Sequence, residues 1–207
     1  MINKKEFINF LMESDALKFG DFVTKSGRRS PYFINIGMFR TGQQMKRLGE
    51  YYAENIIYLM EQDLIPKDLK VLFGPAYKGI PLVTATSIAL ADKGMDFKYC
   101  FNRKEVKDHG EGGTIVGYEP EPGDKLLIIE DVITAGTAVR EVLPLLNERQ
   151  VELCGLMVSV DRMEKGRDKS VKTRPIITLE DILNELENDI PIEIKGKIKD
   201  YMAEYCV

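Results

Sequence analysis

A chain of 207 residues with 44% hydrophobic residues and a net charge of −4 has the composition of an ordinary globular domain, not of a disordered or nucleic-acid-binding protein. No apolar run approaches the roughly 20 residues that span a bilayer, and the N-terminus lacks the apolar stretch of a signal peptide. Cys100, Cys154 and Cys206 have neither metal-ligand nor redox spacing, so we expect free thiols in a cytoplasmic, reducing compartment.

Two helices are predicted before any strand of the main pattern. Over residues 2–19, Phe7, Phe10 and Leu11 have the i, i+3, i+4 spacing of a single apolar helix face. The turn-rich segment KSGRRSPYF (residues 25–33) then breaks the helical pattern with a glycine and a proline. A second helix with one apolar side is predicted over residues 43–60.

From residue 71 onward, short apolar strands alternate with helices. Such alternation is typical of an α/β fold in which helices flank both faces of a mainly parallel sheet. The first forty residues stand outside the alternation, so we expect them to form a small cap over the sheet edge. Strands are expected at residues 71–73, 97–101, 114–118, 126–131 and 151–162. Helices are expected from the end of GPAYKGIP (74–81) to about residue 92, from the TAGT loop (134–137) to about residue 150, and from a capping box of Thr178 and Asp181 to about residue 187.

The segment LLIIEDVITAGTA (residues 126–138) carries the first chemical signal. A strand runs there into two acids, Glu130 and Asp131, and then into a small loop that opens a helix. Unpaired N–H groups at a helix start, the hydroxyls of Thr134 and Thr137, and the close approach that Gly136 allows all favour a single bound phosphate. The lysine of a triphosphate-binding GxxxxGK[ST] loop is missing, and a plain strand–turn–helix corner capped by threonine is the alternative. The acids favour the phosphate interpretation, because a carboxylate can accept hydrogen bonds from two adjacent ribose hydroxyls, and the ligand would then be a ribose 5-phosphate.

A second charged segment, FNRKEVKDHGEGG (residues 101–113), concentrates positive charge. Arg103, Lys104, Lys107 and His109 lie within seven positions and are followed by three glycines. Glycines beside a charged segment suit a mobile lid. Because three acids lie among the cations, a solvated hairpin loop is the alternative.

Three loops follow strands at the positions where an open parallel sheet binds its ligands. They are GPAYKGIP after residue 73, VITAGTA after residue 131 and DRMEKGR after about residue 160. Near the N-terminus, KSGRRSPYFINIG (residues 25–37) places basic residues beside Tyr32 and Phe33, which would give an anion a contact next to an aromatic face. Taken alone, that segment is more simply a β-turn entering a half-buried strand.

These segments together resemble a known family. LLIIEDVITAGTA is similar to the phosphoribosyl pyrophosphate (PRPP) signature of type I phosphoribosyltransferases. The motifs K-S-G-R-x-S-P-Y-F, G-P-A-Y-K-G-I-P, R-K-E-x-K-D-H-G-E-G-G and E-D-V-I-T-A-G-T resemble, in this order, those of the orotate phosphoribosyltransferase family over about residues 15–165. The resemblance implies the type I phosphoribosyltransferase fold in a single domain over residues 1–207, with about residues 1–40 capping the base site.

The resemblance also implies an activity. The family transfers ribose 5-phosphate from PRPP to N1 of orotate, giving orotidine 5′-phosphate and pyrophosphate in de novo pyrimidine (UMP) biosynthesis. Mg²⁺ would be held mainly through PRPP, without a set of protein metal ligands. The partners would be the two small-molecule substrates and a second copy of the chain, since the family's lid reaches the active site of the neighbouring subunit in a homodimer. No nucleic acid and no membrane would be involved.

Individual roles follow from the same motifs. Ile34 stands where many members have phenylalanine, and Glu130 where several have aspartate. The resemblance implies a catalytic set of Arg103, Lys107, His109 and Asp131; a PRPP-binding set of Lys25, Tyr77, Lys78, Arg103, Lys104, Lys107, His109, Glu130, Asp131, Val132, Ile133, Thr134, Ala135, Gly136, Thr137 and Ala138; and an orotate-binding set of Phe33, Ile34, Thr134 and Arg162.

Three other functions are alternatives to this one. A purine phosphoribosyltransferase would share the PRPP loop, but it does not explain KSGRRSPYF together with RKEVKDHGEGG. A regulatory protein that binds PRPP and nucleic acid should carry a basic face or an added module, which a net charge of −4 and the length do not favour. A fusion with a decarboxylase would need a longer chain.

Overall fold

The computed structural model describes residues 2–24, 27–105, 113–133, 136–165 and 171–207, with only the backbone of Thr137. Within these residues, a six-stranded sheet forms the centre of the molecule, in the order β5-β4-β3-β6-β7-β8. Every neighbouring pair is parallel except β4 and β5, which are antiparallel. The mainly parallel sheet predicted from the alternation of strands and helices is therefore confirmed. Its strands are β3 (Val71–Gly74), β4 (Lys98–Asn102), β5 (Ile115–Gly117), β6 (Lys125–Ile133), β7 (Glu152–Asp161) and β8 (Thr173–Thr178).

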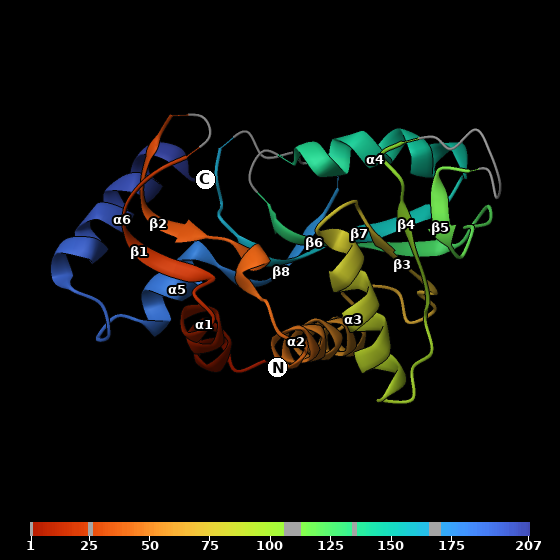
Figure 1. The fold of residues 1–207 in the computed structure, drawn as a ribbon, viewed down its shortest axis with the longest axis horizontal. Coiled ribbons are helices and arrows are strands. Elements are labelled where there is room, and N and C mark those ends of the chain that lie inside the picture. Colours follow the sequence, from red (N-terminus) through yellow and green to blue (C-terminus); the bar gives the residue numbers. More distant parts are fainter. Residues whose placement is uncertain (1, 25–26, 106–112, 134–135, 166–170) are drawn as a thin grey trace.

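Helices cover both faces of this sheet, as Figure 1 shows. The helices α2 (Gly42–Glu61) and α3 (Gly79–Ala91) lie on one face, and α4 (Thr137–Glu148) lies on the other. Side chains of a strand alternate between faces, so β3 sends Leu72 into the core cluster that includes α2 and α3, and Val71 and Phe73 into the cluster that includes α4. The strands are apolar on both sides because both faces are covered.

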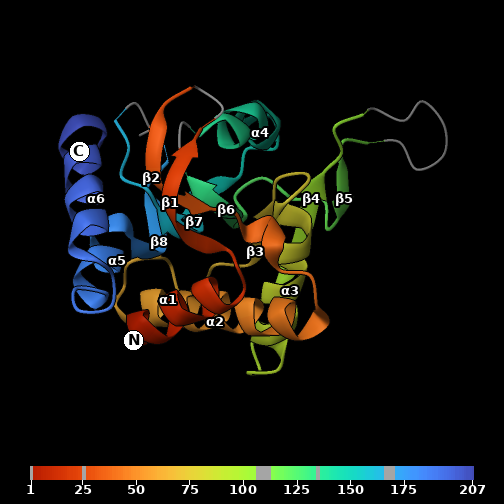
Figure 2. The same ribbon diagram turned by 60° about the vertical axis from the view of Figure 1, so that its left-hand side comes forward.

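A smaller layer lies beyond β8. It begins with α1 (Lys4–Glu13) and continues into an antiparallel hairpin of β1 (Leu17–Val23) and β2 (Arg29–Ile34), which forms a sheet of its own. Figures 1 and 2 both show α6 (Ile192–Tyr205) beside this hairpin, and the rings of Tyr32 and Tyr201 meet edge to face with their centres 5.5 Å apart. The remaining elements of the layer are η1 (Ile36–Met38) and α5 (Leu179–Glu185).

The expected helix over residues 2–19 is wrong in its second half. The helix ends at Glu13, where Asp15 adopts a left-handed backbone with φ of 59° and the N–H of Ala16 donates to the carbonyl of Leu11 at 2.8 Å. The chain then turns back as β1, because Leu17–Val23 finds a partner strand in β2. The helix predicted over residues 43–60 and the capping box of Thr178 and Asp181 are confirmed, whereas β8 and α6 were not predicted.

Among the described residues, no helix has the length and apolar character needed to cross a membrane.

Candidate active site

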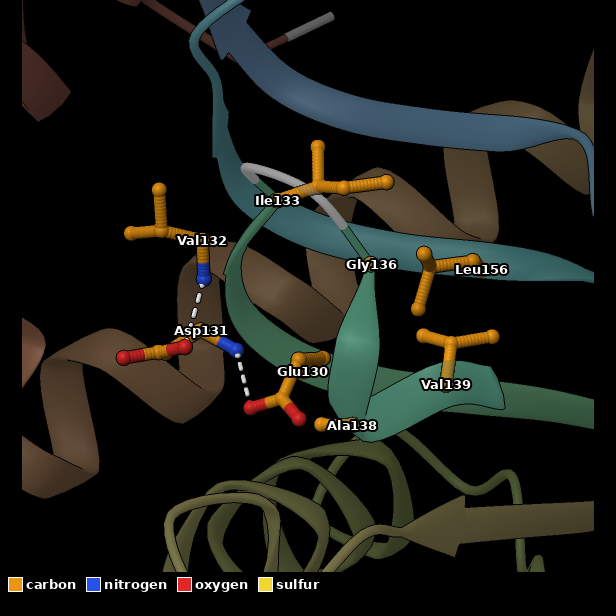
Figure 3. A pocket seen from close by; sticks show the side chains of 8 residues that line it. All are labelled: Glu130, Asp131, Val132, Ile133, Gly136, Ala138, Val139 and Leu156. Atoms are coloured by element: carbon orange, nitrogen blue, oxygen red, sulfur yellow. Dashed lines mark hydrogen bonds between the residues drawn. The ribbon is translucent and has the colours of Figure 1, made fainter. Parts of the chain in front are cut away.

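The two acids singled out in the sequence lie near the carboxyl end of β6, and both are buried. Glu130 is 7% exposed and Asp131 is 8% exposed. Each carboxylate bonds to the next backbone amide: the N–H of Asp131 donates to Glu130 Oε1 at 2.9 Å, and the N–H of Val132 donates to Asp131 Oδ1 at 2.7 Å (Figure 3). Burial, with the neighbouring charge of Asp131 second, raises the pKa of Glu130 to about 8. The protonated form of Glu130 is therefore favoured at neutral pH, which relieves the repulsion between adjacent carboxylates.

Two hydroxyls from other elements hold the backbone of this strand end. Tyr52 of α2 donates its hydroxyl to the carbonyl of Glu130 at 2.7 Å, and Ser159 of β7 donates to the carbonyl of Asp131 at 2.5 Å. Burial raises the pKa of Tyr52 well above its ordinary value, so its hydroxyl stays protonated and remains a hydrogen-bond donor at neutral pH. The acids thus project from a backbone that is fixed from both sides.

A cavity of about 140 Å³ lies between these acids and the start of α4 (Figure 3). Gly136, the residue before the first turn, has a left-handed φ of 74°, a conformation that a residue with a side chain rarely adopts. Because glycine offers no side chain to cap the helix, the first N–H groups of α4 and its dipole can act on a bound anion. The cavity is lined by Glu130, Asp131, Val132, Ile133, Gly136, Ala138, Val139 and Leu156.

The loop after β3 supplies a cation to the same place. Lys78 Nζ lies 2.7 Å from Asp131 Oδ2, although the lysine side chain is 57% exposed. The N–H of Ala76 donates to the side-chain oxygen of Asn102 at 2.8 Å, and the peptide bond between Ala76 and Tyr77 is cis. Tyr77 is exposed, and Lys104 Nζ lies 5.4 Å from the centre of its ring. The segment after β4 and the loop after β3 therefore meet beside Asp131.

A larger cavity of about 520 Å³ extends from Asp131 to the hairpin. Phe33 is 42% exposed on its wall and stacks on Phe22, with ring centres 5.4 Å apart. Arg162 lies on the wall after β7, where Tyr32 accepts from its Nε at 3.1 Å. The cavity joins an aromatic face and a guanidinium to the Lys78–Asp131 pair. Its lining residues are Phe22, Val23, Thr24, Arg28, Ser30, Tyr32, Phe33, Ile34, Lys78, Asp131, Val132, Arg162, Glu164 and Lys165.

Comparison with known proteins decides the family. The family described as the phosphoribosyl transferase domain matches residues 39–189. An orotate phosphoribosyltransferase of Clostridium beijerinckii is 47% identical over 222 aligned positions, which cover 98% of this chain and 97% of that protein. The chain belongs to the orotate phosphoribosyltransferase family.

Two further orotate phosphoribosyltransferases support the same assignment. One from Bifidobacterium adolescentis is 57% identical over 164 residues, covering 78% of this chain and 71% of that protein. The crystal structure of one from Francisella tularensis superimposes with a TM-score of 0.82 at 36% identity, covering 97% of this chain and 96% of that chain. The fold is therefore the type I phosphoribosyltransferase fold, as the motifs implied.

The structure brings together many of the residues that the orotate phosphoribosyltransferase motifs indicated. Phe33, Ile34 and Arg162 from the orotate set share one cavity with Lys78 and Asp131 from the PRPP set. Val132, Ile133, Gly136 and Ala138 line the smaller cavity with both acids, and Tyr77 and Lys104 lie in contact nearby. Arg103 follows β4, where its N–H donates to the carbonyl of Thr114 at 2.8 Å. Lys25, Lys107, His109, Thr134 and Ala135, together with the side chain of Thr137, lie outside the described residues.

Several residues of the site were not predicted. Phe22 stacks beneath Phe33, Asn102 holds the loop after β3, and Glu164 lies in the wall of the large cavity. Glu164 belongs to DRMEKGR, a loop that the sequence marked as a ligand position, so its place two residues after Arg162 was a usable signal. The other two act through contacts that no motif indicates: Phe22 stacks across the hairpin, and Asn102 holds a loop 26 positions earlier in the chain.

Proposed function

We propose that this protein transfers the ribose 5-phosphate group of PRPP to N1 of orotate, giving orotidine 5′-phosphate and pyrophosphate for UMP synthesis. The observation that carries the proposal is the continuous cavity of about 520 Å³, which joins Phe33 and Arg162 to Asp131 and Lys78. A flat anionic base and a ribose with two phosphate-bearing positions need these features side by side.

The sugar and its 5-phosphate fit the smaller cavity. Glu130 and Asp131 would bond the ribose hydroxyls, and residues 134–138 at the start of α4 would bind the 5-phosphate. Glu130 is suited to both donating and accepting, because its raised pKa makes the protonated form available at neutral pH. The left-handed backbone at Gly136 lets the phosphate approach the N–H groups closely.

The pyrophosphate end would be neutralised by cations from three segments. Lys78 lies beside Asp131, and Lys104 lies against the ring of Tyr77. Lys25, Arg103, Lys107 and His109 would add charge from the hairpin and the lid. Cations that meet the leaving group bind the transition state more strongly than the substrate, since the pyrophosphate gathers negative charge as it departs.

The base would lie on Phe33 and Ile34, with Arg162 facing its carboxylate and Thr134 nearby. In the reaction, the bond from C1 of the ribose to the pyrophosphate oxygen breaks with its electron pair going to pyrophosphate. The N1 lone pair of the orotate anion then forms the new bond to C1. The ribosyl centre has oxocarbenium character between these events, so exclusion of water by a lid protects it.

Mg²⁺ fits the residues that are present. No group of three or more His, Cys, Asp or Glu side chains able to hold a metal occurs among the described residues, and Mg²⁺ ordinarily binds through substrate phosphates, water and one or two carboxylates. Asp131, with its carboxylate 12% exposed at the cavity, is the acid we expect to approach such an ion. Bound through PRPP, Mg²⁺ would neutralise charge on the departing pyrophosphate.

We further propose a homodimer in which each lid completes the partner's active site. Ile88 of α3, 60% exposed, and Tyr99 of β4, 39% exposed, are apolar surface that a second copy could cover. A mixture of Lys107→Ala and Asp131→Asn subunits tests this: if sites are shared, random pairing should raise activity to about a quarter of the wild-type value, well above that of either variant alone. No recovery on mixing would contradict shared sites. A cytoplasmic location is proposed from the free thiols Cys100, Cys154 and Cys206.

The proposed activity is tested directly with purified protein, PRPP, Mg²⁺ and orotate. Loss of orotate absorbance should match the release of pyrophosphate, and Lys107→Ala should slow turnover. Parallel reactions with adenine, hypoxanthine, xanthine and uracil should show little turnover. Turnover with a purine alone would agree with the assignment of the PRPP site and refute the assignment of the base. Binding of PRPP without turnover of any base would favour a regulatory protein.

A further inference from the structure

A buried carboxylate bridges two arginines in the wall of the base cavity. The side chain of Glu164 is 4% exposed, and its Oε2 lies 2.6 Å from Arg28 Nη2 while its Oε1 lies 2.9 Å from Arg162 Nη2. The two arginines reach it from different segments, Arg28 from the turn before β2 and Arg162 from the loop after β7. A buried carboxylate is tolerable only with such partners, and the cluster of three retains one excess positive charge.

Two tyrosine hydroxyls complete the cluster. Tyr32 accepts from Arg162 Nε at 3.1 Å, and the guanidinium also lies 4.9 Å from the centre of its ring. Tyr201 of α6 accepts from Arg162 Nη2 at 3.4 Å and donates to Glu164 Oε1 at 2.9 Å. Burial raises the pKa of both tyrosines, so both hydroxyls stay protonated at neutral pH.

These contacts restrict how Arg162 can face the cavity. They use its Nε and Nη2, and no acceptor for Nη1 is found within the described part of the chain. Its side chain is 12% exposed, so it has little freedom to rotate. A planar guanidinium held on one edge by the protein can offer its other edge to a carboxylate.

We propose that Glu164 and Tyr201 are positioning residues for the base substrate, which orient Arg162 toward the carboxylate of an anionic pyrimidine. The inference rests on the proposed function, in which Arg162 meets orotate. It assigns the C-terminal helix α6 to base selection, although the motifs of the family end well before it. A base without a carboxylate gains nothing from the oriented guanidinium, so the cluster favours orotate over uracil.

A purely structural role makes a different prediction. The cluster also ties the hairpin and the loop after β7 to α6, and loss of that tie alone would lower Tm and affect both substrates alike. The informative quantity is therefore the ratio of the KM for orotate to the KM for PRPP. Removal of the Glu164 charge raises the positive potential of the cavity, and this would change the KM values of both anionic substrates. A misoriented Arg162 would change the KM for orotate and leave the KM for PRPP unaltered.

Three variants separate the two roles. Glu164→Gln keeps the shape but removes the charge, and we expect the KM ratio to rise about tenfold or more, as for loss of a charge-assisted hydrogen bond. Tyr201→Phe removes one hydroxyl, and we expect a rise of about three- to tenfold. Tyr205→Phe is the matched control on the same helix: its ring faces Arg28 at 5.1 Å, it does not line the base cavity, and the ratio should stay at the wild-type value.

Equilibrium dialysis with radiolabelled orotate provides a second readout that needs no turnover. Weaker orotate binding by Glu164→Gln and Tyr201→Phe, with Tyr205→Phe unchanged, would support the inference. The inference would be overturned by equal changes in both KM values, or by a fall in Tm with unchanged orotate binding. If Glu164→Gln does not fold, the result for Tyr201→Phe alone tests the inference. If the wild-type protein binds orotate but does not turn it over, the proposed function is refuted, and the comparison of orotate binding among the variants still tests the role of Glu164 and Tyr201. If the wild-type protein binds no orotate, both the proposed function and this inference are refuted.

Discussion

Replacing Glu130 with glutamine should stabilise the protein at neutral pH and weaken its binding of PRPP. The pKa of Glu130 is raised by burial and by Asp131 from 4.5 to about 8, and its Oε1 accepts from a backbone N–H that a glutamine oxygen can also satisfy. The stability contributed by the raised pKa is fully present below about pH 4.5 and is lost as the pH rises toward 8. A glutamine at this position does not titrate, so it adds no pH dependence to the stability of the variant.

The size of the effect follows from proton linkage. Over the pH range in which Glu130 is ionised in the unfolded chain but protonated in the folded chain, each pH unit lowers the free energy of unfolding of wild type by about 1.4 kcal/mol relative to that of the variant. Between about pH 5.5 and 7.5 the variant should therefore gain about 2 to 3 kcal/mol, which for a chain of this size corresponds to a Tm difference that widens by roughly 5–10 °C.

The assay is denaturant and thermal unfolding of both proteins at the two pH values. Glu141→Gln, which changes an exposed carboxyl of α4, is the matched control and should follow wild type. A stability difference between Glu130→Gln and wild type that does not change with pH would refute the reasoning, because it would mean that Lys78 and the backbone keep Glu130 ionised. In turnover assays the stabilised variant should show a higher KM for PRPP, since one hydroxyl-binding carboxyl is altered.

Three further substitutions separate the parts of the site. Lys78→Gln should raise the KM for PRPP about tenfold with little change in Tm, because its pair with Asp131 involves a lysine that is 57% exposed and such pairs contribute about 1 kcal/mol or less; steady-state kinetics and thermal unfolding check both. Phe33→Ala should raise the KM for orotate about tenfold through loss of the aromatic surface, and an equal rise for PRPP would contradict the base assignment. Tyr52→Phe should lower stability by about 1 to 2 kcal/mol by leaving the Glu130 carbonyl without its buried donor, which calorimetry would show as a lower Tm.

The sequence predicted the parts of the fold that depend on local pattern. The strands predicted at residues 71–73 and 126–131 were evident because each contains a run of apolar residues, as expected of a strand buried on both faces. The strand β1 was missed because its exposure alternates irregularly around Gly20 and its pairing shifts register between Phe19 and Phe22. The edge strand β8 contains Pro175, which argues against a strand when the sequence is considered alone.

The candidate site divides in the same way. The loop after β6 is continuous in sequence, so its acids and Gly136 could be assigned to a phosphate site from their order and chemistry. The wall of the base cavity is assembled from segments far apart: Arg28 and Glu164 are separated by 136 positions. Such a pairing cannot be predicted from a single sequence, because it becomes evident only when the chain is folded.

The contact between Tyr201 and Arg162 also bears on the order in which the site can be built during synthesis. The Lys78–Asp131 pair and the start of α4 are encoded before residue 150, whereas the hydroxyl that holds Arg162 lies in the last helix. The groups that bind the sugar phosphate are thus translated before the guanidinium of the base cavity and the Tyr201 hydroxyl that orients it. A chain interrupted between residues 162 and 201 would carry the guanidinium without the group that orients it.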